Sequence, residues 1–281
     1  MITPSPDAGG QLHPSDVPPV GYFERVDERT YRPTAHAGGA WQSDEQHFSP
    51  LGGLVVHAIE RFLAARERTG PELHLSRISY DILGRIALDD TEIHVEAIRP
   101  GRTIELVEAT VVIAGRSTVR ARAWLLAAGD TASVAGGEAE ALPHPDGMDP
   151  WPMASLWPGG FIASLDARAV DPPQPGRART WVSTGTPLVT GETASPLASY
   201  VGLVDTANGV AVRQPPGKWM FPNVDLTIHL HRQPQGGWVG LDTSVVFGAE
   251  GHGLTSTVLH DVHGPVGQAQ QILTVRPLET P

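Results

Sequence analysis

The chain has 281 residues, of which 40% are hydrophobic, so it can bury one large core or two of ordinary size. Its net charge of -11 at pH 7 argues against a general nucleic-acid or membrane-surface binder. The absence of cysteine excludes disulfides, thiolate catalysis and cysteine-ligated zinc.

The N-terminal residues 1–19 have neither a basic region nor an apolar region, so we do not expect them to form a secretory signal. We expect this segment to be a disordered lead-in. No apolar run is long enough to cross a bilayer, so we predict a cytoplasmic protein without membrane insertion.

The first half predicts two short strands, one helix and four further strands. The short strands cover 22–26 and 30–34. The helix has Ser49 and Pro50 as its cap and first turn, followed by an apolar stripe that includes Leu54, Val55 and Ile59. Runs with strand character follow at 75–86, 91–100, 104–115 and 117–128, separated by turn residues as in an antiparallel meander.

The order repeats after a segment rich in Gly, Ala, Pro and acidic residues, which we predict to be a linker over 130–158. Two strands are expected at 160–170 and 180–189. A second helix is expected from Ser195, with Pro196 at its first position. Four strands follow at 219–234, 236–251, 252–264 and 265–277.

Matching residues support a tandem repeat. Arg85 and Arg232 each end the strand after a helix, and Val119 and Val266 each open a last strand; both pairs are 147 residues apart. We therefore predict an α+β fold of two tandem repeats, over 20–129 and 159–281, related by a pseudo-two-fold axis. Each repeat would place a long helix against an antiparallel sheet.

Two polar features stand out in the second half. Asp205 interrupts the apolar residues near the end of the second helix. On the strand that follows, alternation predicts one polar face formed by Asn223, Asp225, Thr227, His229 and His231. His229 and His231 have no third ligand at a recognisable spacing, so no metal site is predicted.

The whole pattern resembles the hotdog fold in its double form, and more closely the acyl-CoA thioesterase II (TesB-like) family. The resemblance covers roughly residues 22–277. Its most specific parts are VDLTIHLHR and AQQILTVR, in which Gln271 lies five residues before Arg276. The resemblance implies that Asp205, Asn223 and Gln271 are catalytic, with Asn223 at a position where some members have Thr. His231, within the first motif, is expected to contact substrate.

Thioester chemistry is compatible with these residues. Without cysteine or a G-x-S-x-G motif, direct attack by water suits a carboxylate acting as base. Gly52 and Gly53 open the first helix and are expected to let substrate approach backbone donors, at this site or at its pseudo-symmetric counterpart. Subtracting 147 maps the catalytic residues onto Ala58, Ser76 and Trp124, which predicts one active site per chain.

We therefore expect an acyl-CoA thioesterase that needs no cofactor, since coenzyme A is part of the substrate. A homo-oligomer, either a dimer or a larger assembly, is expected, and no nucleic-acid partner. The first alternative is a non-catalytic acyl-CoA or acyl-lipid binding protein on the same fold. The second is a hotdog hydratase or dehydratase, whose typical helix-start stretch neither half contains.

Overall fold

The computed structural model describes residues 19–278, so the predicted lead-in over 1–19 lies outside the described residues except for its last residue. The first half contains six strands and one long helix. In chain order they are β1 (Phe23–Arg25), β2 (Thr30–Pro33), α1 (Phe48–Ala64), β3 (Leu73–Ile82), β4 (Thr91–Arg99), β5 (Ile104–Ile113) and β6 (Arg116–Ala127).

The second half repeats this order after a segment with short helical turns. Its elements are α2 (Gly160–Ala163), β7 (Leu165–Ala169), β8 (Arg177–Thr184), α3 (Pro196–Val204), α4 (Ala207–Val210), β9 (Trp219–Met220), β10 (Asp225–Leu230), β11 (Val239–Phe247), β12 (His252–Asp261), β13 (Gly264–Thr274) and β14 (Arg276–Pro277). The boundaries predicted at 129/130 and 158/159 stay predictions.

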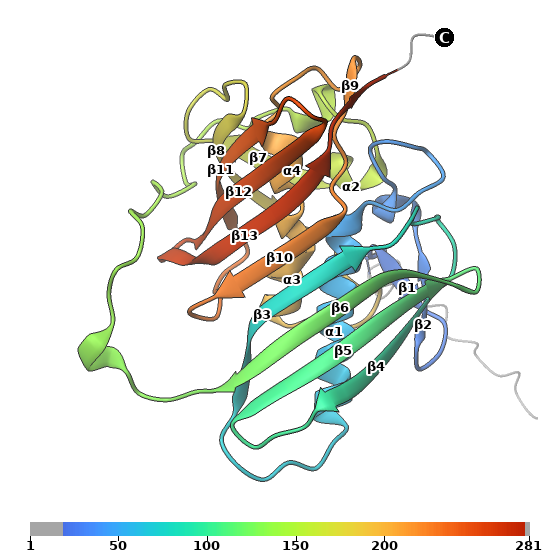
Figure 1. The fold of residues 1–281 in the computed structure, drawn as a ribbon, viewed down its shortest axis with the longest axis vertical. Coiled ribbons are helices and arrows are strands. Elements are labelled where there is room, and N and C mark those ends of the chain that lie inside the picture. The colour runs from blue at the N-terminus through green and yellow to red at the C-terminus, as the bar shows by residue number, and fades with distance from the viewer. Residues whose placement is uncertain (1–18, 279–281) are drawn as a thin grey trace, which may run out of the picture.

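Twelve of the strands form one antiparallel sheet in the order β1-β2-β4-β5-β6-β3-β10-β13-β12-β11-β8-β7. The two halves are mirrored in this order, and they meet where β3 pairs with β10, with Ile78 opposite Ile228. Figure 1 shows α1 and α3 next to each other behind the sheet. The fold is thus α+β, with the helices on one face of a continuous sheet.

The alternation of each strand explains which face is covered. On β5, Val107, Ala109 and Val111 are fully buried against the helices, whereas Glu108 lies on the other face and accepts a hydrogen bond from Arg122. α1 is buried over most of its length, since it lies between the sheet and α3.

Only the first repeat has a long helix, which corrects the prediction of a long helix in each repeat. α1 has 17 residues, whereas α3 has nine and stops at Asp205, before the single turn of α4. Beyond α4 the chain continues through Pro215, Pro216 and Gly217, which are poor helix formers, so the second half has no helix as long as α1.

The caps are partly as predicted. Ser195 caps α3, because its hydroxyl accepts a hydrogen bond from the Ala198 N–H. α1 begins earlier than predicted. His47 is its N-cap and accepts from the Ser49 N–H through Nδ1, so Ser49 and Pro50 lie within the first turn.

The repeat is offset by 148 residues rather than 147. The Leu259–Gly267 pair of β12 and β13 corresponds to the Val111–Val119 pair of β5 and β6, and a register shift follows in both halves (259 − 111 = 148; 267 − 119 = 148). The first-half counterparts of Asp205, Asn223 and Gln271 are therefore His57, Leu75 and Ala123, not Ala58, Ser76 and Trp124.

Within residues 19–278 there is no helix with both the length and the apolar character that a membrane crossing requires.

Candidate active site

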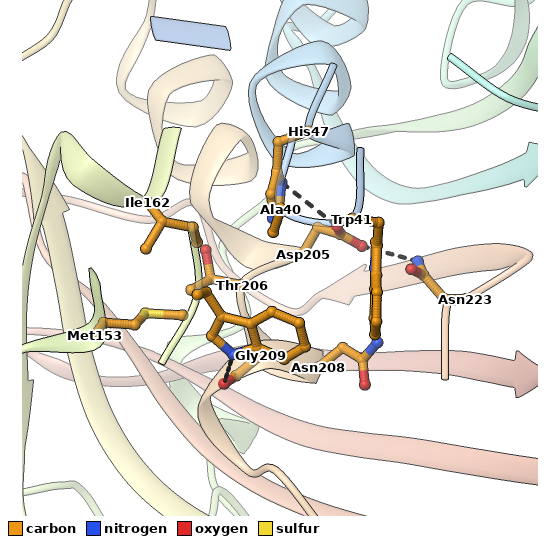
Figure 2. Close-up of a pocket in the computed structure, with 11 residues that line it drawn as sticks. Ala40, Trp41, His47, Met153, Ile162, Asp205, Thr206, Asn208, Gly209 and Asn223 are labelled. Atoms are coloured by element: carbon orange, nitrogen blue, oxygen red, sulfur yellow. Dashed lines mark hydrogen bonds and ion pairs between the residues drawn. The ribbon is translucent and has the colours of Figure 1, made fainter. Parts of the chain in front are cut away.

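The structure brings together the three residues predicted to be catalytic. Asp205 follows the last turn of α3 and is only 7% exposed. Its Oδ1 accepts two hydrogen bonds, one from Asn223 Nδ2 at 2.9 Å and one from Gln271 Nε2 at 2.8 Å. Figure 2 shows the Asn223 side chain directed at this carboxylate. The second oxygen, Oδ2, has His47 Nδ1 at 3.9 Å.

Asn223 reaches Asp205 through an irregularity in the sheet. The pairing of β10 with β13 matches Thr227 with Gln270, but the bridge before it matches Asn223 with Leu273, which is one residue out of register. Because a one-residue slip moves a side chain to the other face, Asn223 points to the helix side. The prediction that it shares a face with His229 is therefore wrong.

Gln271 reaches the same carboxylate from a regular position. It lies on the helix-facing side of β13, between the more exposed Gln270 and Ile272, and is 1% exposed. Its Nε2 is bonded to Asp205, while its Oε1 is buried without a hydrogen-bond partner in the part of the chain that the structure describes. This leaves one buried acceptor beside the carboxylate.

Burial sets the protonation of the site. It raises the pKa of Asp205 to about 6, and the hydrogen bonds from Asn223 and Gln271 oppose this rise only in part. Burial also lowers the pKa of His47 to about 3. At neutral pH the pair is thus a carboxylate beside a neutral imidazole, whose proton is on Nε2 because Nδ1 accepts from Ser49.

His47 was missed by the sequence reading. Nothing in its local spacing distinguishes it from the other histidines, and it approaches Asp205 only because the start of α1 lies beside the end of α3. Thr206 was missed as well; its hydroxyl is buried and unpaired within residues 19–278.

Two spaces that share part of their lining adjoin Asp205. We call the first the inner cavity; it has a volume of about 40 Å³ and is lined by Ala40, Trp41, His47, Met153, Trp157, Ile162, Asp205, Thr206, Asn208, Gly209 and Asn223. We call the second the outer pocket; it has about 400 Å³ and includes Trp41, His47, Phe48, Ile82, Arg85, Ile86, Asp205, Met220, Asn223 and Arg276. Asp205 thus lines both a small space and a wider one.

The three residues predicted to bind substrate lie elsewhere. A Cβ on Gly53 would be 2.6 Å from the Ala198 carbonyl oxygen, because α1 and α3 cross there. Gly52 is buried in α1, and its carbonyl accepts from the Tyr80 hydroxyl. His231 is exposed in a groove on the opposite face of the sheet. The two glycines lie in the closely packed part of α1. The alternation of side chains along the strand places His231 on the other face of the sheet.

The counterpart position in the first half holds an ion-pair network. His57 occupies the place of Asp205, and its Nε2 lies 3.2 Å from Glu192 Oε2. Arg25 and Arg61 also bind this glutamate. Since Leu75 and Ala123 replace the two amides, this position lacks the donors that surround Asp205.

Within residues 19–278, no group of three or more His, Asp or Glu side chains is placed to hold a metal ion.

Comparison with family models identifies the fold and its relatives. The model for the acyl-CoA thioesterase N-terminal domain matches residues 37–126, and that for the C-terminal domain matches residues 139–275. The chain belongs to the acyl-CoA thioesterase family. Both domains of the family are therefore present in one chain, in the expected order. Its general class is that of the thioester hydrolases. No protein with a curated description matches the sequence.

Solved structures agree at the level of the fold. A hotdog protein of unknown function from Alicyclobacillus acidocaldarius has a TM-score of 0.70 at 14% identity, with 91% of this chain and 96% of that chain covered. The acyl-CoA thioesterase II TesB2 of Mycobacterium marinum has 0.64 at 16% identity, with 92% and 97% covered. The predicted hotdog fold is thus confirmed, apart from the shorter second helix.

Proposed function

We propose that this member of the family hydrolyses acyl-CoA to a free acid and coenzyme A, with Asp205 as the general base. The observation that carries the proposal is the environment of Asp205. Asn223 and Gln271 occupy one carboxylate oxygen, so Oδ2 is the oxygen available to take a proton. A pKa of about 6 keeps this base ionised at neutral pH.

In the proposed reaction, Asp205 takes a proton from a water molecule while the oxygen of that water attacks the thioester carbonyl carbon. The buried Oε1 of Gln271 is placed to orient the water, since it is an unpaired acceptor beside the carboxylate. His47 Nε2–H is a neutral donor for the oxyanion. The intermediate then expels the thiolate, and Asp205 returns the proton to it.

The chemistry of the pocket favours an enzyme over a binding protein. A ligand-binding pocket has no need of a buried carboxylate with a raised pKa, because burying that charge costs folding free energy. A buried carboxylate with a raised pKa is instead what a general base in contact with substrate requires. The non-catalytic binding protein stays the alternative.

Thiol release from acetyl-, butyryl-, octanoyl-, lauroyl- and phenylacetyl-CoA tests the proposal. We expect release from at least one of them. Tight acyl-CoA binding in calorimetry without release from any would favour the binding protein. Hydration of an enoyl-CoA, followed by ultraviolet absorbance, would favour the hydratase instead.

The pH dependence gives a separate expected result. Since the base must be ionised, kcat/KM should fall about tenfold per pH unit below pH 6 and level off above it. The change Gln271→Ala removes a hydrogen bond that lowers the pKa of Asp205, so the fall should move to higher pH. A flat profile between pH 5 and 8 for the wild type would contradict the assignment of Asp205 as base.

A cytoplasmic location, the absence of a cofactor and assembly into homo-oligomers stay predictions. Light scattering would measure the assembly state.

A further inference from the structure

Trp41 lies where three spaces meet. It lines the inner cavity and the outer pocket, and it also lines a third space of about 260 Å³, which we call the lateral pocket. Leu156, Pro216 and Met220 also line the lateral pocket. Ala40, Trp41 and Trp157 border both the lateral pocket and the inner cavity, so these side chains form the wall between the two.

The wall is an aromatic cluster. The Trp41 ring lies 5.0 Å from Trp157 and 5.4 Å from Phe221, and both contacts are edge-to-face (Figure 2 shows the indole of Trp41 beside Asp205). Trp157 is further fixed by its Nε1–H, which donates to the Gly209 carbonyl, and Phe221 is 1% exposed. Trp41 is only half-buried and comes from the loop before α1. It is therefore the most exposed of the three aromatic side chains.

Charge indicates how a thioester would lie in these spaces. The outer pocket is lined by two guanidinium groups, Arg85 and Arg276, and, besides Asp205, by one carboxylate, Glu45, whereas the inner cavity has no Arg or Lys in its lining and its His47 is neutral. The phosphates of coenzyme A would lie at the arginine end. The acyl group would then extend past Asp205 towards Met153, Trp157 and Ile162.

The size of the inner cavity limits that acyl group. A water-sized group needs about 10–15 Å³ of such space, so about 40 Å³ holds roughly three. We propose that the enzyme acts on acyl-CoA thioesters with short acyl groups, of up to about four carbons, and that the indole of Trp41 sets this limit by closing the lateral pocket. This inference rests on the proposed function and adds the substrate class.

The test compares thiol release across acetyl-, butyryl-, octanoyl- and lauroyl-CoA for the wild type, Trp41→Ala and Trp238→Ala. Trp238 is a matched control, since it is a half-buried tryptophan that packs under Arg168 outside all three spaces. We expect the wild type to prefer the two short substrates by at least about tenfold in kcat/KM, because a misfit methylene typically costs that factor or more. Trp41→Ala should shift the preference to octanoyl-CoA by at least about tenfold, and Trp238→Ala should leave it unchanged.

The outcomes separate the two proposals. No release from any thioester by the wild type would overturn the proposed function itself. Release by the wild type with a preference for lauroyl-CoA, or with the same profile in Trp41→Ala, would overturn only the chain-length inference. Trp41→Phe keeps a smaller aromatic ring in the cluster and should give an intermediate profile; this variant decides the matter if Trp41→Ala unfolds below the assay temperature.

Discussion

Replacing Asp205 with asparagine is expected to reduce kcat about 10²–10⁴-fold, the usual contribution of a general base. Asparagine has nearly the same shape, and its carbonyl oxygen can still accept from Asn223 and Gln271. What it cannot do is take a proton from water. Thiol release measured at pH 8 would show the loss, and activity within about threefold of the wild type would rule out Asp205 as the base.

A matched control is available on the other face of the sheet. Asp225 is the first residue of β10, and its carboxylate accepts a hydrogen bond from the Ile272 N–H of β13 at 2.6 Å. Asp225→Asn keeps an acceptor there and lies outside the inner cavity and the outer pocket. We expect it to retain activity, so that the comparison isolates the position of the carboxylate rather than the change of side chain.

The same Asp205→Asn variant should be more stable than the wild type at pH 8. The pKa of Asp205 is about 6 in the folded state and 3.8 as its ordinary value, so the ionised form opposes folding. This cost is absent below pH 3.8, grows as the pH rises to 6, and then stays at about 3 kcal/mol. Urea unfolding at pH 4 and pH 8 measures it.

Gly53→Ala is expected to destabilise the protein by about 1–3 kcal/mol or more through the crossing of α1 and α3. The new Cβ would lie 2.6 Å from the Ala198 carbonyl oxygen and 2.8 Å from Gly202 Cα. Both atoms belong to the backbone of α3, so the helices must separate. Because Asp205 follows the end of α3, loss of activity should accompany the loss of stability.

Gly52→Ala is the control in the next position of the same helix. Its Cβ would meet Phe48 and Tyr80 side-chain atoms at 3.6–3.9 Å, which is ordinary contact. The gain in helix propensity, about 1 kcal/mol, is the same for both variants, so their difference in unfolding free energy measures the crossing alone. Equal stabilities would show that the helices do not need this glycine.

Matching residue types gave an offset of 147 between the repeats, whereas the pairing of the strands gives 148. The sequence predicts Ser49 and Ser195 as the caps of the two helices, but His47 rather than Ser49 caps α1. Hydrogen-bond register, not letter matching, defines the true counterparts. One active site per chain stays a prediction; the first half has His57, Leu75 and Ala123 where the second half has a carboxylate and two amides.

Residue pattern alone determined the tandem α+β architecture, because apolar periodicity and motif spacing are local properties of the chain. The choice of Asp205 with its two amide partners came from the resemblance to the family. Tertiary structure decided the rest. The register shift before β10 turned Asn223 inward, the crossing of α1 and α3 gave Gly53 a packing role, and strand parity placed His231 on the far face. His47 and Trp41 meet Asp205 only through contacts between distant segments, which no local pattern encodes.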